Sequence, residues 1–235
     1  MNGIAKIYSE PVDYGIALKM QEAAVTECAA DGIPHLFVLQ HPHVVTIGRD
    51  AKPEDRRLDD DDLRRQGIDV HEITRRGSFT YHGPGQLIMY PVLPIELMMG
   101  SPRLHIDKLQ QSVIDLLQIY NIHSYGSQDP EHPGVFTDTG IKNNDKKIAA
   151  IGVEFRKVAQ RRRITMHGAG VYVNPDLSYF NMIFPCGDKD AKLTSIEAEM
   201  GTTPDMGEAM QRFVEQFSKN TGIQFTLETI LQPTS

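Results

Sequence analysis

The sequence predicts one mixed α/β domain, of the α+β kind, over residues 1–235. Two observations carry this prediction: short apolar runs typical of buried strands, and longer segments with the spacing of amphipathic helices. The two kinds of segment do not alternate regularly as strand, helix and strand, which disfavours a doubly wound parallel sheet. No stretch rich in glycine, proline or serine divides the chain, and its length is sufficient to bury a substantial core.

Segments with helical periodicity carry apolar residues three or four positions apart, which places them on one face of a helix. They cover residues 13–30, 104–120 and 205–221, and a further short helix is expected after the acidic run 59–62. Gly32 and Gly222 follow two of these segments, as expected of residues that end helices in the left-handed conformation. The acidic run complements the dipole at the start of its helix.

Short apolar runs predict the strands. They are expected at residues 35–40, 44–48, 70–74, 87–93, 134–137, 147–155, 164–167, 170–173 and 224–227. Residues 75–86 are rich in glycine and are expected to form an irregular crossing between strands. The polar stretch 126–145 is interpreted as a long functional loop around the short strand that it contains.

The composition disfavours several classes of protein. A net charge of −7 gives no global signal for nucleic-acid binding. Cys28 and Cys186 are too few for a disulfide framework or a cysteine-based zinc site, and they favour a reducing compartment. No apolar run is long enough to cross a membrane, and residues 1–6 resemble neither a signal peptide nor a presequence. The expected compartment is the cytoplasm, or an organellar matrix if a presequence has been removed.

A cysteine framed by proline and glycine is the strongest candidate for catalysis. Cys186 stands in Phe184-Pro185-Cys186-Gly187, a turn sequence that can present a thiol beside backbone N–H groups. A thiolate attacks carbonyl carbons and forms an acyl-enzyme thioester. The alternative is a buried structural cysteine, which is how we interpret Cys28 on the apolar face of the first helix.

A lysine inside an apolar run is the second candidate. Lys147 opens Lys147-Ile148-Ala149-Ala150-Ile151-Gly152. Partial burial favours a neutral amine and a nearby ammonium favours a thiolate, so a lysine and a thiol that meet can exchange a proton. The alternative is a lysine whose amine reaches solvent from the end of a strand.

Two histidines precede glycine, in His82-Gly83-Pro84-Gly85 and in His167-Gly168-Ala169-Gly170. Glycine lets a ligand approach the backbone closely, so both turns are candidate binding segments. The glycines match neither nucleotide-binding pattern, and no zinc motif is present. His41 and His43 would share one face of an extended chain, which is only a weak signal for a metal.

Taken together, four segments resemble the lipoyl(octanoyl) transferase family. They are Thr80-Tyr81-His82-Gly83-Pro84-Gly85-Gln86-Leu87, Lys147-Ile148-Ala149-Ala150-Ile151-Gly152, His167-Gly168 and Pro185-Cys186-Gly187, in the order and approximate spacing of that family. His41-Pro42 and Thr46-Ile47-Gly48-Arg49 look like its early motif. The resemblance covers roughly residues 8–200. It implies the biotin/lipoate ligase-like fold, with a large mixed β-sheet, a smaller sheet and surrounding helices.

The resemblance also implies a reaction and its partners. An octanoyl group moves from octanoyl-acyl carrier protein to one lysine of a lipoyl domain, the first step of endogenous protein lipoylation. The implied acceptors are the lipoyl domains of 2-oxo-acid dehydrogenase complexes and the glycine cleavage H protein. No metal, cofactor, nucleic acid or membrane is implied.

Site residues are carried over position by position. The acyl-bearing nucleophile falls on Cys186 and the proton carrier on Lys147. The implied acyl-binding residues are Arg75, Arg76, Gly77, Ser78, Phe79, Thr80, Tyr81 and His82, then Ala150, Ile151 and Gly152, then Gly168, Ala169 and Gly170, with His167 and Gly83 in support. Phe79, Tyr81 and Ile151 are expected to wall an apolar slot for the acyl chain.

The chain departs from the family pattern in a few places. Arg76 replaces a glycine, so its side chain either narrows the slot or points outward. The segments 137–146 and 156–163 are longer than expected, and the second is a basic patch that would suit an acidic carrier protein. Three other functions stay open: an ATP-dependent lipoate or biotin ligase, a cysteine thioesterase that uses His82 or His167 as base, and a binding module without catalysis.

Overall fold

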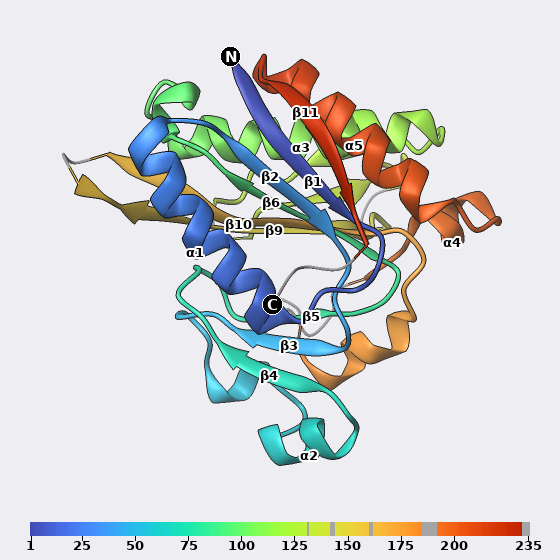
Figure 1. The fold of residues 1–235 in the computed structure, drawn as a ribbon. Coiled ribbons are helices and arrows are strands. Elements are labelled where there is room, and N and C mark those ends of the chain that lie inside the picture. Colours follow the sequence, from blue (N-terminus) through green and yellow to red (C-terminus); the bar gives the residue numbers. More distant parts are fainter. Residues whose placement is uncertain (131, 142–143, 160–161, 185–191, 232–235) are drawn as a thin grey trace.

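The computed structural model describes residues 1–130, 132–141, 144–159, 162–184 and 192–231. Within these residues an eight-stranded mixed sheet runs in the order β11-β1-β2-β6-β10-β9-β8-β7, and a three-stranded sheet runs β4-β3-β5 (Figure 1). The predicted combination of a large mixed sheet, a smaller sheet and surrounding helices is confirmed. The described part of the chain contains no helix that is long and apolar enough to cross a membrane.

The large sheet is mixed because its N-terminal strand lies between two parallel neighbours. Its strands are β1 (Asn2–Tyr8), β2 (His35–Leu39), β6 (Gln86–Val92), β7 (Ser124–Gly126), β8 (Gly134–Thr137), β9 (Lys147–Lys157), β10 (Arg163–Tyr172) and β11 (Gln224–Ile230). Strand β1 pairs in parallel with both β11 and β2, whereas the pairs from β2 through to β7 are antiparallel. The long β9 and β10 therefore lie side by side near the middle of the sheet.

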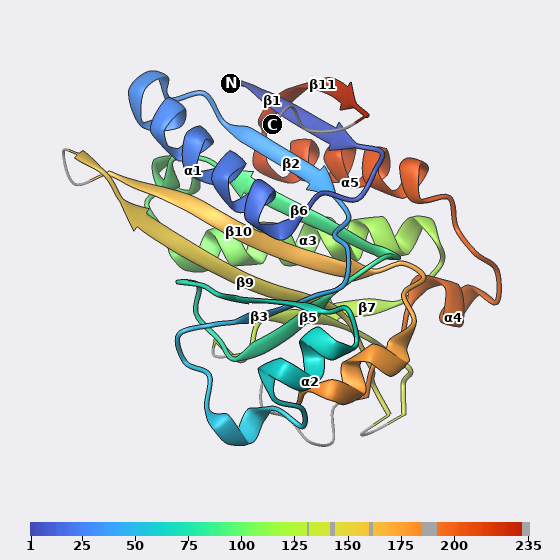
Figure 2. The same ribbon diagram turned by 60° about the horizontal axis from the view of Figure 1, so that its bottom comes forward.

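The small sheet contains β3 (Val44–Ile47), β4 (Asp69–Glu72) and β5 (Phe79–His82), with β3 parallel to β4 and antiparallel to β5. It does not continue the large sheet but lies across from β9 (Figure 2). Its own core contains Val45, Tyr81 and Phe180. The space between the two sheets is therefore bounded by β5 and its preceding turn on one side and by β9 and β10 on the other.

Helices cover both faces of the large sheet (Figure 1). Helix α1 (Tyr14–Asp31) packs on one face, where Cys28 joins a core with Phe37 and Met166. Helices α3 (Pro102–Ile119) and α5 (Met206–Thr221) pack on the other face, against a core from β1, β6, β9 and β10. The short helices are α2 (Asp60–Arg65) and α4 (Ile196–Met200), with 3₁₀ turns at Pro53–Asp55, Ile95–Met98 and Leu177–Met182.

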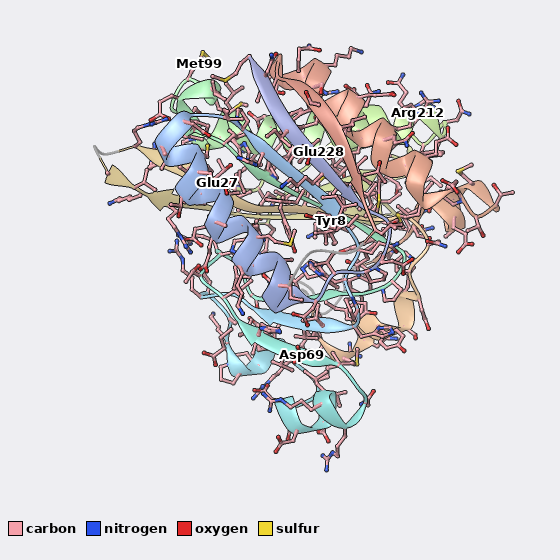
Figure 3. All side chains as sticks on the ribbon, viewed as in Figure 1. Tyr8, Glu27, Asp69, Met99, Arg212 and Glu228 are labelled. Atoms are coloured by element: carbon pink, nitrogen blue, oxygen red, sulfur yellow. The ribbon has the colours of Figure 1, made fainter. Side chains whose placement is uncertain are left out.

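The sequence determines where the long helices begin and end. The side chains of Asp13, Ser101 and Asp205 each accept a hydrogen bond from a backbone N–H in the first turn of α1, α3 and α5. Gly32 and Gly222 end α1 and α5 in the left-handed conformation. On α5 the polar face points to solvent, as Arg212 shows (Figure 3), while Phe213 and Phe217 are fully buried.

The structure corrects the predicted strands in several places. The crossing at 75–86 contains strand β5, and the two strands expected at 164–167 and 170–173 form the single strand β10. Strands β1 and β7 and helix α4 were not predicted. Strand β10 is continuous because β9 pairs with it from Arg163 to Val171, while β6 pairs with it from Ala169 to Tyr172.

Candidate active site

A cavity of about 980 Å³ lies between the two sheets. Residues from the start of α1, from the turn before β5 and from β5 itself line one side, and β9 and β10 line the other. Of the residues expected to bind an acyl group, thirteen line this cavity: Arg75, Arg76, Gly77, Ser78, Thr80, His82, Ala150, Ile151, Gly152, His167, Gly168, Ala169 and Gly170. Segments far apart in the sequence therefore meet at one hollow of a size that suits a small-molecule chain.

Small residues on β9 and β10 form the floor of the cavity. Gly152 pairs with Gly168, and Ala150 pairs with Gly170, across the two strands. The alternate residues of these strands, such as Val153 and Ala169, belong to the core under α3 and α5. Because side chains alternate between the two faces of a sheet, the cavity face of this region carries almost no side-chain volume.

Gly168 is required by the backbone around it. The preceding residue, His167, has φ 57, an unusual value for a residue with a side chain. A Cβ on Gly168 would lie 2.1 Å from the carbonyl oxygen of Met89 on β6. A substituted residue at 168 would therefore collide with a neighbouring strand of the sheet.

Strand β5 divides its side chains between the cavity and the core of the small sheet. Thr80 and His82, with Ser78 just before the strand, line the cavity, whereas Phe79 and Tyr81 are buried in the small-sheet core. The expectation that Phe79 and Tyr81 wall the acyl slot is thereby corrected, because the two-residue period of the strand turns them to the opposite face. Ile151 is among the residues that border the cavity, but it also belongs to the core under α3 and α5.

Gly83 also lies on the core side of β5. A Cβ at this position would fall 2.1 Å from the Tyr81 hydroxyl and 3.2 Å from Nδ1 of His43. The Tyr81 hydroxyl is hydrogen-bonded to that nitrogen at 2.7 Å. Gly83 therefore supports the packing of β5 rather than the cavity surface.

Arg75 and Arg76 point in opposite directions. Arg75 is 6% exposed, and its guanidinium donates to Oγ1 of Thr46 at 2.8 Å, to the Thr46 carbonyl at 3.3 Å and to the Arg76 carbonyl at 3.0 Å. Arg76 instead pairs with Asp50 at 3.1 Å and keeps a largely exposed side chain. The arginine that replaces the family's glycine therefore points outward at the rim and does not narrow the slot.

Aromatic and imidazole rings close the buried end of the cavity. Nδ1 of His41 donates to the Val12 carbonyl at 2.6 Å, and its Nε2 lies 2.8 Å from the Tyr90 hydroxyl. Tyr14 contacts the rings of His41 and His82. The expectation that His41 and His43 share one face is wrong. His41 faces the large sheet, whereas the ring of His43 stacks on Tyr179.

These imidazoles are held neutral. Burial lowers the pKa of His41 to about 4. Burial, and then the charges of His41 and Arg75, lower the pKa of His82 well below its usual range. Burial likewise raises the pKa of Tyr14 to about 12. At neutral pH the buried end therefore presents neutral rings and hydroxyls around one fixed cation, Arg75.

Glu154 and His167 face one another at the edge of the cavity. Nε2 of His167 lies 3.7 Å from a Glu154 carboxylate oxygen, which also accepts from the hydroxyl of Thr74, and Arg156 contacts the other oxygen at 3.3 Å. The His167 ring, Thr74 and Arg156 outweigh burial and lower the pKa of Glu154 to about 2. Burial lowers the pKa of His167, against the opposing pull of Glu154.

A β-bulge aims Lys147 toward the cavity face. Val135 of β8 pairs with Ala149, but the next residue, Phe136, pairs with Lys147, so Ile148 is an extra residue in β9. Ile148 and Ala149 both point into the core under α3. Lys147 is therefore turned onto the face that carries Ala150 and Gly152, as bulges commonly re-aim a side chain.

The side chain of Lys147 is buried and packed. It is 5% exposed, its Nζ lies 5.9 Å from the centroid of the Phe136 ring, and its Cε lies 2.8 Å from where a Cβ of Gly134 would stand. Gly134 is the strand partner of Ala150, which lines the cavity. The alternative for Lys147, a lysine that reaches solvent from the end of a strand, does not fit this burial; Lys147 is not among the residues that line the cavity.

Cys186 lies outside the described residues, and its position is not part of this geometry. The residues that flank this segment are described. The N–H of Phe184 donates to the carbonyl of Asp55, which lines the cavity, and the N–H of Lys147 donates to the carbonyl of Lys192 at 2.8 Å. Cys28 is fully buried under α1, and burial raises the pKa of its thiol to about 12, which agrees with a structural cysteine.

Several cavity residues were not anticipated from the sequence. Tyr14 begins α1, Tyr90 lies inside an apolar strand, and Glu154 lies on β9 two residues after Gly152. The position of Glu154 on the same face as Gly152 was the one available signal. In the described ranges no three His, Cys, Asp or Glu side chains group as metal ligands would.

Arginines of the basic segment 156–163 are engaged in contacts within the protein, which its composition did not indicate. Arg156 contacts Glu22 and Glu154, Arg162 donates to the Ala29 carbonyl, and Arg163 donates to the Gly100 carbonyl. These arginines attach the β9–β10 hairpin to α1 and to the turn after Met98. Residues 160 and 161 lie outside the described part of the chain.

The fold is that of the lipoate-protein ligases. A lipoate-protein ligase A structure bound with ATP superposes with a TM-score of 0.73 and 19% identity, covering 98% of this chain and 90% of that one. The family model of the lipoyl protein ligase A/B catalytic domain matches residues 13–218.

Curated relatives narrow the class. An octanoyltransferase from Solibacter usitatus is 36% identical over 88% of this chain and 88% of its own length. An octanoyltransferase from Porphyromonas gingivalis is 34% identical over 90% of this chain, which spans 43% of that longer protein. The chain belongs to the octanoyltransferases of the lipoyl protein ligase A/B catalytic-domain family.

Proposed function

We propose that this octanoyltransferase carries the octanoyl group as a thioester on Cys186. The donor is octanoyl-acyl carrier protein, the acceptor is a lysine of a lipoyl domain, and Lys147 moves the protons. The observation that carries the proposal is the burial of Lys147 on the cavity face of β9, where its backbone bonds to Lys192. Chain connectivity supports it too, because Cys186 is two residues from Phe184, which is attached to the cavity-lining Asp55.

In the first half-reaction the Cys186 thiolate attacks the donor carbonyl carbon and forms a tetrahedral oxyanion. Backbone N–H groups near Cys186 and Gly168 stabilise that oxyanion, at roughly 3 kcal/mol for each donor. When the oxyanion collapses, the bond to the donor sulfur breaks, and the Lys147 ammonium gives its proton to the departing thiolate. The products are the octanoyl-Cys186 thioester, a free donor thiol and neutral Lys147.

In the second half-reaction a lipoyl-domain lysine attacks the same carbonyl. The neutral Lys147 amine accepts a proton from the attacking amine, and the Cys186 thiolate leaves. The products are the octanoyl amide of the lipoyl-domain lysine and the enzyme with its Cys186 thiolate and Lys147 ammonium restored. Every proton and electron pair is accounted for, and no ATP is needed. Conversion of a thioester into an amide is downhill, which drives the sequence forward.

The cavity supplies the binding energy for the acyl chain. Each buried methylene contributes about 0.8 kcal/mol, so the seven carbons beyond the carbonyl contribute roughly 5 kcal/mol. The glycines of the floor leave room for the acyl chain on the face of the large sheet toward which Lys147 is turned. We propose the lipoyl domains of 2-oxo-acid dehydrogenase complexes and the glycine cleavage H protein as acceptors, in the cytoplasm or an organellar matrix.

Intact-mass measurement after mixing with octanoyl-acyl carrier protein tests the proposal. Wild-type protein should gain about 126 Da, the mass that an octanoyl group adds, and Cys186→Ser should gain nothing. Lys147→Ala should slow formation of this adduct by orders of magnitude. An adduct on Cys186→Ser, or normal kinetics in Lys147→Ala, would reassign the corresponding role.

Two controls separate the alternative functions. A ligase would consume ATP, so unchanged transfer in ATP-free buffer excludes ATP-dependent activation. A thioesterase would release octanoate at full rate without any lipoyl domain. Transfer that needs the lipoyl domain, with little free octanoate, supports the proposed reaction.

A further inference from the structure

The cavity has an open outer end and a buried inner end. At the outer end Arg49, Lys52 and Arg76 are exposed, whereas at the inner end Tyr14 and Tyr90 are almost completely buried. The inner end is polar, because it holds the two tyrosine hydroxyls and the ring of His82 beside Arg75. An apolar chain that enters from the outer end therefore reaches polar groups before it reaches the end of the cavity.

The glycine floor is the apolar part, and its length can be estimated along β9. The Lys147 side chain reaches back to Gly134, opposite Ala150, and the floor continues through Gly152 to Glu154. At about 3.3 Å per strand residue, Gly152 is roughly 7 Å and Glu154 roughly 13 Å from Ala150. The seven carbon–carbon bonds of an octanoyl group, each about 1.5 Å long, span roughly 9 Å in a fully staggered chain. A chain whose carbonyl lies beside Lys147 thus ends just past Gly152.

Arg75 stands at that point. Its Cδ lies 3.2 Å from where a Cβ of Gly152 would be, so the side chain rests on the floor of the large sheet. Its guanidinium is fixed on the other side by Thr46 of the small sheet. A Cβ on Gly48 would fall 2.8 Å from Nη1 of Arg75, so that glycine leaves room for the guanidinium. Arg75 therefore crosses the cavity from one sheet to the other.

We propose that Arg75 sets the acyl-chain length that the enzyme accepts, by blocking the glycine floor after about eight carbons. This inference rests on the proposed octanoyl transfer. A longer chain must either displace a guanidinium that three acceptors hold or fold back toward the outer end. Both cost free energy, because the displaced cation would lose buried hydrogen bonds.

The first test replaces the block by an apolar side chain of similar length. Acyl-pantetheine thioesters of about six to fourteen carbons serve as donors, and a lipoyl domain serves as acceptor. We expect wild-type protein to prefer eight carbons over twelve by tenfold or more in kcat/KM, a range that one pocket contact can produce. Arg75→Met should raise the ratio of twelve-carbon to eight-carbon transfer at least tenfold.

A second variant should shift the preference the opposite way. Gly152→Ala adds a methyl group to the floor under Arg75, which shortens the slot. We expect its preference to move from eight to about six carbons. Thr46→Val removes one acceptor of the guanidinium and should relax the length limit by less than Arg75→Met does. These two variants decide the question if Arg75→Met does not fold.

Arg76→Met is the matched control, because Arg76 is the neighbouring arginine but points to Asp50 at the rim. Its ratio of twelve-carbon to eight-carbon transfer should equal the wild-type ratio, whatever its rate. Thermal stabilisation of each variant by free fatty acids of the same lengths gives a readout of binding without catalysis.

The outcomes separate this inference from the proposed function. If wild-type protein transfers no octanoyl group, the proposed function fails. If it transfers octanoyl but Arg75→Met, Gly152→Ala and Thr46→Val all keep the wild-type length profile, Arg75 is not the limit and the inference is overturned. A profile that changes equally in Arg76→Met would overturn it as well.

Discussion

The side chain of Lys147 packs against Gly134, so that a Cβ on Gly134 would lie 2.8 Å from Cε of Lys147. The same Cβ would lie 2.7 Å from the Ala149 carbonyl oxygen. Glycine at 134 is therefore what allows the bulged strand to hold the lysine against β8. Gly134, which lies in the turn-rich stretch 126–145, thus contacts Lys147, the proposed proton carrier.

Gly134→Ala should displace Lys147 and slow transfer at least tenfold, with a loss of stability of about 1–3 kcal/mol from overpacking. Rates are measured at a temperature where the variant is fully folded, so that stability and catalysis separate. Gly207→Ala, in the first turn of α5, is the matched control and should keep the wild-type rate. A wild-type rate in Gly134→Ala would mean that the position of Lys147 against Gly134 is not needed.

His105 should make the protein less stable in mild acid. Its ring is fully buried under β9 against Phe155, where neither nitrogen has a hydrogen-bond partner in the described structure, and burial lowers its pKa from 6.5 to about 4. The unfolded chain binds the proton more readily, so the stability that the neutral ring allows is complete above pH 6.5 and is lost as the pH falls toward 4. This shift corresponds to about 3 kcal/mol.

His105→Leu should therefore be more stable than the wild type, with the gain growing as the pH falls from 6.5 to 4. Chemical unfolding curves at several pH values measure the difference. His123→Gln, at an exposed histidine, is the control and should follow the wild-type pH dependence. A His105→Leu variant that is parallel to the wild type at every pH would contradict the buried neutral ring.

Glu154 should add to the loss of stability in acid, but over a lower pH range than His105 does. Its pKa is lowered from 4.5 to about 2 by His167, Thr74 and Arg156. The carboxylate therefore stabilises the fold above pH 4.5, and this contribution is lost as the pH falls toward 2. Glu154→Gln should lose less stability than the wild type over that range, as followed by acid titration of thermal unfolding. Glu215→Gln, which removes an exposed carboxylate on α5, should leave the slope unchanged.

Arg57 should matter for acylation because of its contact with Phe184. Its guanidinium lies 4.5 Å from the centroid of the Phe184 ring, two residues before Cys186 in the sequence. A cation–π contact of this kind is worth about 0.5–1 kcal/mol at an exposed site. Arg57→Ala should therefore slow formation of the acyl adduct about two- to fivefold, measured by intact mass over time. Arg64→Ala, on the exposed side of α2, is the comparison and should acylate normally.

Local patterns in the sequence were sufficient for most of the elements. Helices α1, α3 and α5 lie within two residues of their predicted positions, because apolar spacing, the capping residues Asp13 and Asp205 and the terminal glycines all act over a few residues. Strand β1 escaped prediction because Gly3 and Ala5 occupy the first two of its buried positions, so that only Ile7 and Tyr8, at its end, give a strong hydrophobic signal among those positions. Strand β5 was hidden by the glycines around it.

By itself the sequence determined the family, through short motifs in a recognisable order, together with the long helices and most of the strands. Only the tertiary structure decided how the side chains are aimed. A bulge turned Lys147 to the cavity face, the pairing of β5 with β3 sent Phe79 and Tyr81 into the core, and contacts with Thr46 and Gly152 stretched Arg75 between two sheets. The physical reason is range: periodicity and capping act between near neighbours, whereas strand register and the facing of two sheets depend on residues far apart in the chain.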